Sequence, residues 1–157
     1  MRVYIVRHGK AEPVSETGRD FDRRLAERGV RQAAFIADTL GASTSPPTSV
    51  VSSDAERAHS TAQPLVERLG CDAQIDRRLR VDEPASRALD VIQAHRNNGT
   101  LCIVGHNPQL AEVIGVLTGG VAAHEVRLRT GEAWEIDIDV ESPIGSGRLI
   151  GVHRLDD

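Results

Sequence analysis

Apolar residues occur along this chain in short continuous runs that alternate with stretches of helical spacing. Runs at residues 2–6, 50–51 and 100–104 predict strands that are buried on both faces, as is typical of parallel sheets. A weaker run at 73–75 predicts one further strand. Between the runs, apolar residues recur at i, i+3, i+4 and i+7, which indicates helices with one buried face.

The first two predicted helices have recognisable ends. One covers about residues 26–40 and is expected to end at Gly41. The next is expected to begin at Ser53, because the spacing from Ser53 to Glu56 is that of a capping box. Its last turn is followed by Gly70, a residue that commonly terminates helices.

The third and fourth helices are marked by prolines. Pro84 is expected in the first turn of the third helix, which closes at residues 97–99. The fourth is expected to use Asn107 as its N-cap, with Pro108 at the first helical position, and to end at Gly119-Gly120.

After the fourth helix the pattern changes to alternation. Residues 133–140 and 148–152 are predicted to form antiparallel strands joined by a turn at 145–147. Residues 9–24 and 42–49 are predicted loops. The order of elements predicts a three-layer α/β/α fold, in which a mostly parallel sheet has helices on both faces and C-terminal antiparallel strands.

Composition narrows the classes of protein to consider. With 157 residues and 39% hydrophobic content, we expect a single domain over residues 1–157. The net charge of -4 does not favour a nucleic-acid partner, and no apolar run approaches the roughly 20 residues that span a bilayer. A strand that begins at residue 2 leaves no room for a signal peptide. We therefore expect a cytoplasmic monomer that contacts no membrane and keeps its two cysteines reduced.

The first candidate for chemistry is Arg7-His8-Gly9, directly after the strand at 2–6. Ligands bind at the carboxyl ends of strands in parallel α/β sheets. The planar fork of Arg7 matches phosphate oxygens, and Gly9 is expected to let a ligand approach the backbone closely. Taken alone, the motif could equally be a surface Arg-His pair.

The second candidate, Gly105-His106-Asn107-Pro108, follows the strand at 100–104. The helix predicted to open there offers unpaired N–H groups and the positive end of a dipole to an anion. Its alternative interpretation is a helix-capping turn that happens to contain a histidine.

The third candidate is the segment Ser52–Ala62, which again follows a strand and opens a helix with Arg57 in its first turn. Arg57 could be an exposed arginine that pairs with Asp54 or Glu56. However, three strand ends that each carry an imidazole or a cation beside a helix start favour one anion site. The pattern indicates phosphoryl chemistry on a histidine nucleophile.

At this point the chain resembles the histidine phosphatase superfamily, also called phosphoglycerate-mutase-like. The resemblance covers about residues 2–118 and includes the segment from Asp22 to Ala33, where Arg24 replaces the usual proline. The short chain is most similar to the SixA-type phosphohistidine phosphatases, which lack the inserted cap of the mutases. The motifs that carry the resemblance are Arg7-His8-Gly9, Ser53–Thr61, Gly105-His106-Asn107-Pro108, and the pieces Asp22–Leu25, Gly29 and Gln32-Ala33.

The resemblance implies a role for each matched residue. His8 would be the nucleophile that forms a phosphohistidine intermediate, while Arg7, Arg57 and His106 would bind the phosphoryl oxygens. Arg23 at the pocket mouth and Asn107 at the helix opening are further candidates for substrate binding. The mechanism would need no metal and no cofactor, and the substrate would be a phosphorylated protein or a small phosphate ester.

The general acid is a separate question. Many relatives use a carboxylate after the third strand, where this chain has Asp82 and Glu83. Glu83 as the acid would favour phosphate esters, whereas a phosphohistidine substrate needs less help because imidazole is the better leaving group. Both carboxylates could instead be solvated.

Other classes of protein remain as alternatives. A small-molecule phosphomonoesterase and a non-catalytic phosphate-binding module would share this fold. A metal protein that uses His8, His59 and His106 lacks the usual ligand spacing, and a dinucleotide-binding domain lacks Gly-x-Gly-x-x-Gly after its first strand. We expect Trp134 to be in the core. Four histidines are expected to be surface or structural residues: His59, His95, His124 and His153.

Overall fold

The structure is a computed structural model that describes residues 1–119 and 125–156. Its strands are β1 (Arg2–Arg7), β2 (Ser49–Ser52), β3 (Ala73–Ile75), β4 (Leu101–Gly105), β5 (Glu132–Asp137) and β6 (Arg148–Arg154). Its helices are α1 (Glu27–Gly41), α2 (Glu56–Leu69), α3 (Ala85–Ala94) and α4 (Gln109–Thr118), with short 3-10 turns η1 (Asp20–Asp22) and η2 (Arg77–Leu79). Among the described helices, none is long and apolar enough to cross a membrane.

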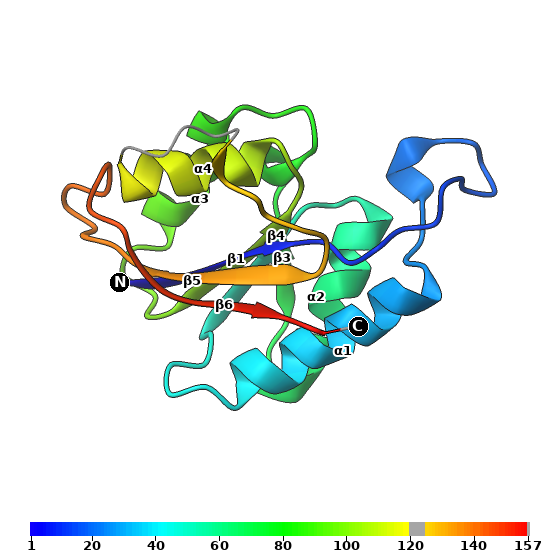
Figure 1. The fold of residues 1–157 in the computed structure, drawn as a ribbon, viewed down its shortest axis with the longest axis horizontal. Helices are drawn as coiled ribbons and strands as arrows, with labels where there is room; N and C mark the ends of the chain where they lie inside the picture. The colour runs from blue at the N-terminus through cyan, green and yellow to red at the C-terminus, as the bar shows by residue number, and fades with distance from the viewer. Residues whose placement is uncertain (120–124, 157) are drawn as a thin grey trace.

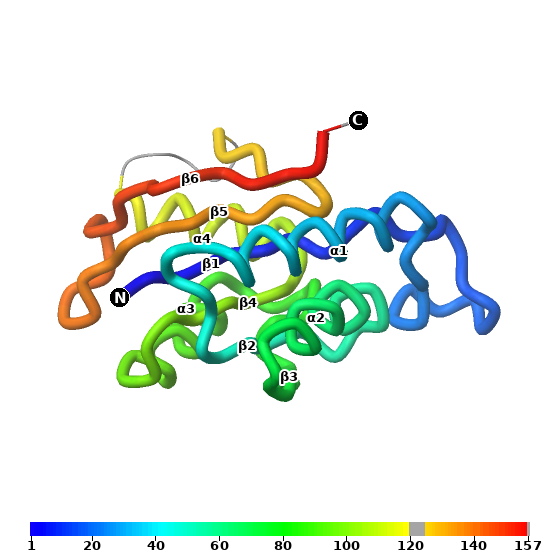
Figure 2. Tube along the Cα trace, turned by 90° about the horizontal axis from the view of Figure 1, so that it is seen from below, coloured from blue at the N-terminus to red at the C-terminus, as the bar shows by residue number. Residues whose placement is uncertain are grey.

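Across the described residues, the strands form one sheet in the order β3-β2-β4-β1-β5-β6 (Figure 1). The first four strands are parallel, while β5 runs antiparallel to β1 and β6 antiparallel to β5. Helices α1 and α2 cover one face of the sheet and α3 and α4 the other (Figures 1 and 2). The predicted three-layer α/β/α fold is confirmed, and the antiparallel strands extend the main sheet rather than forming a separate one.

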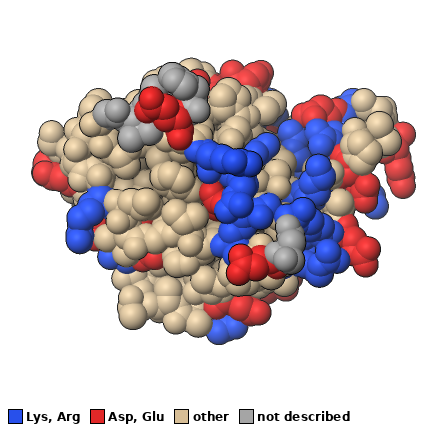
Figure 3. All heavy atoms as spheres, viewed as in Figure 1, with Lys and Arg blue, Asp and Glu red and all other residues tan. Residues whose placement is uncertain are grey.

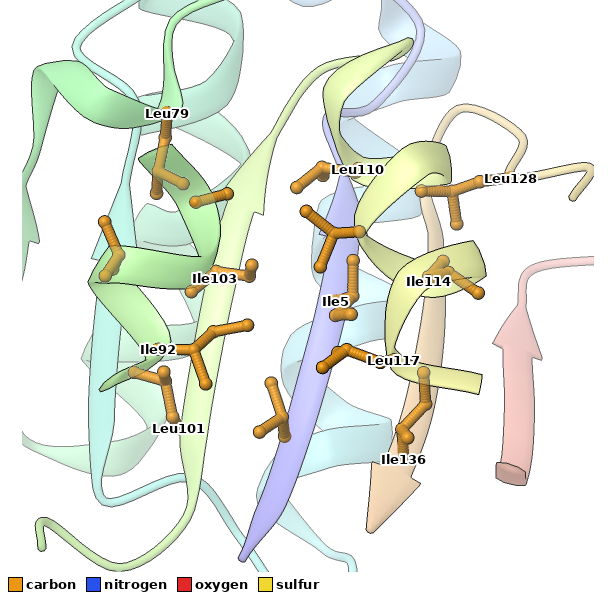
Figure 4. Close-up of a cluster of buried hydrophobic side chains, with 14 of the residues drawn as sticks. Ile5, Leu79, Ile92, Leu101, Ile103, Leu110, Ile114, Leu117, Leu128 and Ile136 are labelled. Carbon is orange, nitrogen blue, oxygen red and sulfur yellow. The ribbon is translucent and has the colours of Figure 1, made fainter. Parts of the chain in front are cut away.

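Side chains of β1 alternate between two cores, as the period of a strand requires. Val3 and Ile5 pack in the cluster under α3 and α4, shown in Figure 4, while Tyr4 and Val6 pack in the cluster under α1 and α2. All four are fully buried. A buried apolar side chain of this size contributes about 1.5–3 kcal/mol, so β1 is held firmly from both faces.

Three of the described helices end at the predicted glycines. Gly70 and Gly119 adopt left-handed conformations directly after α2 and α4. Gly120 lies outside the described residues. Helix α1 also ends at Gly41 as predicted, but Gly41 is the last helical residue and has no positive φ.

Helix α3 differs from its prediction. It ends at Ala94, before the predicted stop at 97–99, and His95 is its C-cap. Pro84 precedes the helix as its N-cap instead of lying within the first turn. A proline at this position is tolerated because an N–H there would have no helical partner.

Both predicted N-caps with polar side chains are wrong. Helix α2 begins at Glu56 with Ala55 as its N-cap, and Ser53 bonds elsewhere. Helix α4 begins at Gln109 with Pro108 as its N-cap, and the amide of Asn107 donates to Leu128 O at 2.8 Å. In both places a tertiary partner takes the side chain that the local spacing assigns to a cap.

The segment between β1 and α1 projects from the body of the molecule (Figures 1 and 2). Its two ends are tied together by a bridge between Ala11 and Leu25 and by the bond from Glu12 N to Arg24 O, at 2.8 Å. Because its ends are paired, this segment forms a closed loop, and η1 lies within the loop.

Candidate functional site

The carboxyl ends of β1, β2 and β4 meet at one edge of the sheet. Beyond the last paired residues, the His8 amide still donates to Gly105 O and the Ser53 amide to Val104 O, both at 3.0 Å. His8, Ser53 and His106 therefore start from neighbouring points on this edge.

His8 is held in one tautomer by the backbone. Its Nδ1 lies 2.7 Å from Gly9 O, and a carbonyl oxygen only accepts, so Nδ1 carries the proton. Its Nε2 then has a lone pair, which accepts from Arg57 Nε at 3.3 Å. Burial lowers the His8 pKa to about 4, with the charges of Arg57 and Arg7 adding to this effect. The ring is therefore neutral at pH 7.

Arg57, in the first turn of α2, is buried and spans the site. Its Nη1 donates to Asp20 O at 2.8 Å, and its Nη2 donates to Asp20 Oδ2 at 3.0 Å. Asp20 also accepts from Arg23 Nη1 at 2.9 Å. Burial tends to raise the Asp20 pKa, but the Arg23 hydrogen bond and the Arg57 charge outweigh it and lower the pKa. The ionised carboxylate of Asp20 therefore forms an ion pair with Arg57.

Two other polar side chains at this edge have unsatisfied atoms. Arg7 donates from Nη1 to Leu128 O at 3.2 Å, but its buried Nε has no hydrogen-bond partner among the described residues. The Oδ1 of Asn107 is also buried and has no partner in the described part of the chain. Burial, followed by the charge of Arg57, lowers the Arg7 pKa. Unpaired buried donors are costly, which favours a ligand at this place.

His106 is almost completely buried, and its ring centroid lies 5.1 Å from that of His8. Its Nε2 is 2.9 Å from Ser53 Oγ. Its Nδ1 is buried without a hydrogen-bond partner in residues 1–119 and 125–156. Burial lowers the His106 pKa to about 3, and His8 and Arg57 act in the same direction.

These side chains line a cavity of about 290 Å³. A neighbouring cavity of about 470 Å³ shares Asp20, Arg57 and His106 with it. Lysines and arginines gather on the surface near the carboxyl end of β1 and over the segment that leads into β5 (Figure 3). The arrangement combines a neutral nucleophilic imidazole with several cations, which suits a tetrahedral oxyanion.

Residues 3–82 match the family model of the histidine phosphatase superfamily, branch 1. This chain belongs to the histidine phosphatase superfamily. The resemblance inferred from the motifs is confirmed.

Two curated relatives show the breadth of the superfamily. A protein named probable phosphoglycerate mutase GpmB, from Citrobacter koseri, is 36% identical over 99% of this chain and 70% of its own length. Glucosyl-3-phosphoglycerate phosphatase from Mycobacterium tuberculosis is 38% identical over 50% of this chain and 35% of its own length. Among solved structures, a candidate phosphohistidine phosphatase SixA from Agrobacterium tumefaciens superposes with a TM-score of 0.83 at 28% identity, over 97% of this chain and 96% of that one. Together these similarities support a phosphatase.

The histidine phosphatase fold brings most of the predicted residues together. The smaller cavity is lined by six of them: Arg7, His8, Arg23, Arg57, His106 and Asn107. Asp82 lines the neighbouring cavity. Glu83 lines neither cavity, and its carboxylate lies 3.6 Å from the guanidinium of Arg87.

Sequence reasoning missed the residues that support His8 and Arg57. Thr61 Oγ1 accepts from the Gly9 amide at 2.9 Å and donates to Arg57 O at 2.7 Å. Thr61 lies one helical turn after Arg57, and this spacing could have indicated it. Asp20, in a loop without periodicity, had no comparable signal.

Gly9 has a packing role that the sequence did not predict. A Cβ added to Gly9 would lie 2.7 Å from Gly29 O, and one added to Gly29 would lie 2.0 Å from Lys10 O. The close contact between the turn after His8 and the start of α1 therefore requires glycine here, and the approach of a ligand to Gly9 stays a prediction.

The three remaining histidines that the structure describes do not line the site. His95 is buried and bonds Val91 O and Gln74, and His153 pairs with Glu135. His59 lines neither cavity, and His124 lies outside the described residues. Within the described ranges, no three His, Cys, Asp or Glu side chains are grouped so that they could hold a metal ion. Trp134 is only partly buried against the core, and its indole N–H donates to Glu132 at 2.8 Å.

Proposed function

We propose that the protein is a metal-independent phosphatase that forms phosphohistidine on His8. The observation that carries this proposal is the hydrogen bond from His8 Nδ1 to Gly9 O, at 2.7 Å, which leaves the Nε2 lone pair beside Arg57. Nε2 attacks phosphorus, and the bond to the leaving group breaks with its electron pair. Water then attacks the phosphohistidine, so that inorganic phosphate leaves and His8 is restored.

Two cations and a neutral imidazole supply most of the rate enhancement in this mechanism. Arg7, Arg57 and His106 bind the equatorial oxygens, where charge is spread in the transition state. The Nε of Arg7 and the Nδ1 of His106 support this assignment, because both lack a partner among the described residues and both side chains line the smaller cavity. Arg57 exchanges part of its contact with Asp20 for the phosphoryl oxygens, while Arg23 and Asn107 contact substrate at the rim.

The substrate that we propose is a phosphorylated protein histidine. Asp20 has a lowered pKa in the free protein, and Glu83 lies outside both cavities. A leaving group that needs little protonation suits such a site, and imidazole is such a group. The similarity to a SixA structure over nearly the whole of both chains supports the same substrate class.

A small phosphate ester is the second candidate. Asp82 lines the larger cavity, where the leaving group of an ester would lie, and could protonate an alkoxide there. The relative from Mycobacterium tuberculosis, named for a phosphorylated sugar acid derivative, favours this alternative.

Phosphate release from three substrates tests the proposal: a phosphohistidine protein, an aryl phosphate and a sugar phosphate. We expect wild type to favour the phosphohistidine protein, to be unaffected by EDTA, and to form an acid-labile phosphoenzyme in rapid-quench samples. His8→Asn should lose turnover and phosphoenzyme, whereas the control His59→Asn should retain both. Near-wild-type turnover by His8→Asn would exclude His8 as nucleophile, and preference for the sugar phosphate would select the second candidate.

A further inference from the structure

Ser53 is fully buried at the end of β2, and its hydroxyl faces His106. The Ser53 Oγ lies 2.9 Å from His106 Nε2 and accepts a hydrogen bond from the Ala55 amide at 3.2 Å. Helix capping does not explain this side chain, because Ser53 is not the N-cap of α2. Glu56, the expected partner in a capping box, instead accepts from Ser60 Oγ at 3.1 Å.

The protons around this hydroxyl can be counted. A serine hydroxyl has one proton to donate, and an imidazole nitrogen can either donate or accept. If His106 Nε2 donated to Ser53, the buried Ser53 proton would have no other acceptor among the described residues. If Ser53 donates to Nε2, the hydroxyl is satisfied on both sides and the ring proton lies on Nδ1.

The second arrangement leaves one unsatisfied group, the Nδ1–H of His106. This atom is buried without a partner within the described residues, and the ring lines both cavities of the site. A phosphoryl oxygen bound there would accept from it. The opposite tautomer would turn a lone pair of His106 toward an anion, which is repulsive.

We propose that Ser53 is a positioning residue that holds His106 as the Nδ1–H tautomer, so that the neutral ring donates a hydrogen bond to the phosphoryl group. The inference rests on the proposed function for its ligand, although the tautomer itself is a property of the free protein. The low pKa of His106 is consistent with a neutral ring, since burial and the nearby His8, Arg57 and Arg7 lower it more than the charge of Asp20 raises it.

Nitrogen-15 NMR of labelled histidine tests the tautomer without any substrate. Protonated and unprotonated ring nitrogens have well-separated shifts, and the His106 signals are assigned by their loss in His106→Asn. We expect wild type at pH 7 to show Nδ1 protonated and Nε2 unprotonated at His106. Protonation of Nε2 instead would overturn the proposal.

Substitution of Ser53 tests the cause of this tautomer. We expect Ser53→Ala to move the His106 proton to Nε2 and to lower kcat/KM about 100-fold, the typical loss for one oxyanion donor. The matched control is Ser52→Ala, which removes an equally buried hydroxyl that donates to Ser53 O at 2.8 Å and is not the hydrogen-bond partner of His106 Nε2. It should change neither signal nor rate by more than a few fold.

A conservative variant separates positioning from packing. Ser53→Cys keeps a small group with a weak donor and is expected to retain the Nδ1–H signal and intermediate activity, and it replaces Ser53→Ala if that variant does not fold. An unchanged tautomer in Ser53→Ala, or equal losses for Ser52→Ala and Ser53→Ala, would overturn the role of Ser53. Lack of turnover by wild type on every phosphorylated substrate would instead reject the proposed function, while the NMR result would still stand.

Discussion

The two histidines of the site occupy equivalent places but are bonded through opposite ring nitrogens. His8 and His106 follow neighbouring parallel strands, are both buried, and have ring centroids 5.1 Å apart. Burial is the largest cause of the lowered pKa of each ring. The difference lies in which nitrogen is bonded: Nδ1 of His8 meets Gly9 O, whereas Nε2 of His106 meets Ser53 Oγ.

This comparison shows that exposure and residue type do not decide what a buried imidazole does. A carbonyl can only accept, so it leaves the far nitrogen of His8 as a lone pair. A hydroxyl can donate, and our proposal for Ser53 leaves the free nitrogen of His106 as an N–H. The nucleophile and the oxyanion donor would then be the same tautomer, held from opposite ends of the ring.

The sharpest test replaces each histidine with asparagine, whose amide lies near the position of Nδ1. His8→Asn keeps the bond to Gly9 O but has no nucleophile, so we expect kcat to fall by at least about 10⁴-fold. His106→Asn keeps a donor near the Nδ1 position, so we expect only about a 10- to 100-fold loss in kcat/KM. Steady-state kinetics with an aryl phosphate measure both, and equal losses would contradict the division of roles.

Acid should destabilise the protein through the same two rings. The His8 pKa falls from 6.5 to about 4 on folding, so between these values the unfolded chain binds a proton that the folded state does not. Stability is therefore lost as pH falls from 6.5 to 4, by roughly 3 kcal/mol for His8. Urea unfolding of wild type and His8→Asn across this range should show a shallower loss in the variant. His59→Asn is the control, and parallel curves for His8→Asn and wild type would show that His8 is not linked to stability.

The smallest expected effect concerns Asp20, whose carboxylate forms an ion pair with Arg57. Asp20→Asn removes an anion that competes with phosphate for Arg57 and Arg23, so inhibition by inorganic phosphate or vanadate should tighten. The Asp20 side chain is 56% exposed and solvent screens it, so we expect roughly a fivefold lower inhibition constant that approaches wild type at high salt. Asp22→Asn, in the same turn, is the matched control. An unchanged inhibition constant for Asp20→Asn would show that Asp20 does not compete with the anion.

Sequence patterns predicted the elements of this fold well because continuous apolar runs and helical spacing are local signals. The strands around 2–6 and 100–104 and the histidines that follow them needed no tertiary information. That β1 and β4 are neighbours could not be predicted, because strand order depends on contacts between residues about a hundred positions apart.

The supporting residues were harder to predict for the same reason. Ser53 and Asn107 satisfy local rules for helix caps, yet each bonds a distant partner, His106 or Leu128. Asp20 reaches Arg57 from a loop whose residues follow no periodic pattern. Where a polar side chain has both a local and a distant partner available, sequence spacing indicates only the local one.

The paired ends of the loop between β1 and α1 have a consequence for redesign. Ala11 pairs with Leu25, and Gly9 packs directly on Gly29. These contacts support the turn that carries His8, and none of them involves the residues between Ala11 and Leu25. Lengthening a surface loop adds little entropy cost, about 0.6 kcal/mol for each doubling of its length. Residues 13–18 are therefore a natural place to graft new recognition segments, because Asp20 and Arg23, which line the cavity, and the turn that carries His8 would keep their own contacts.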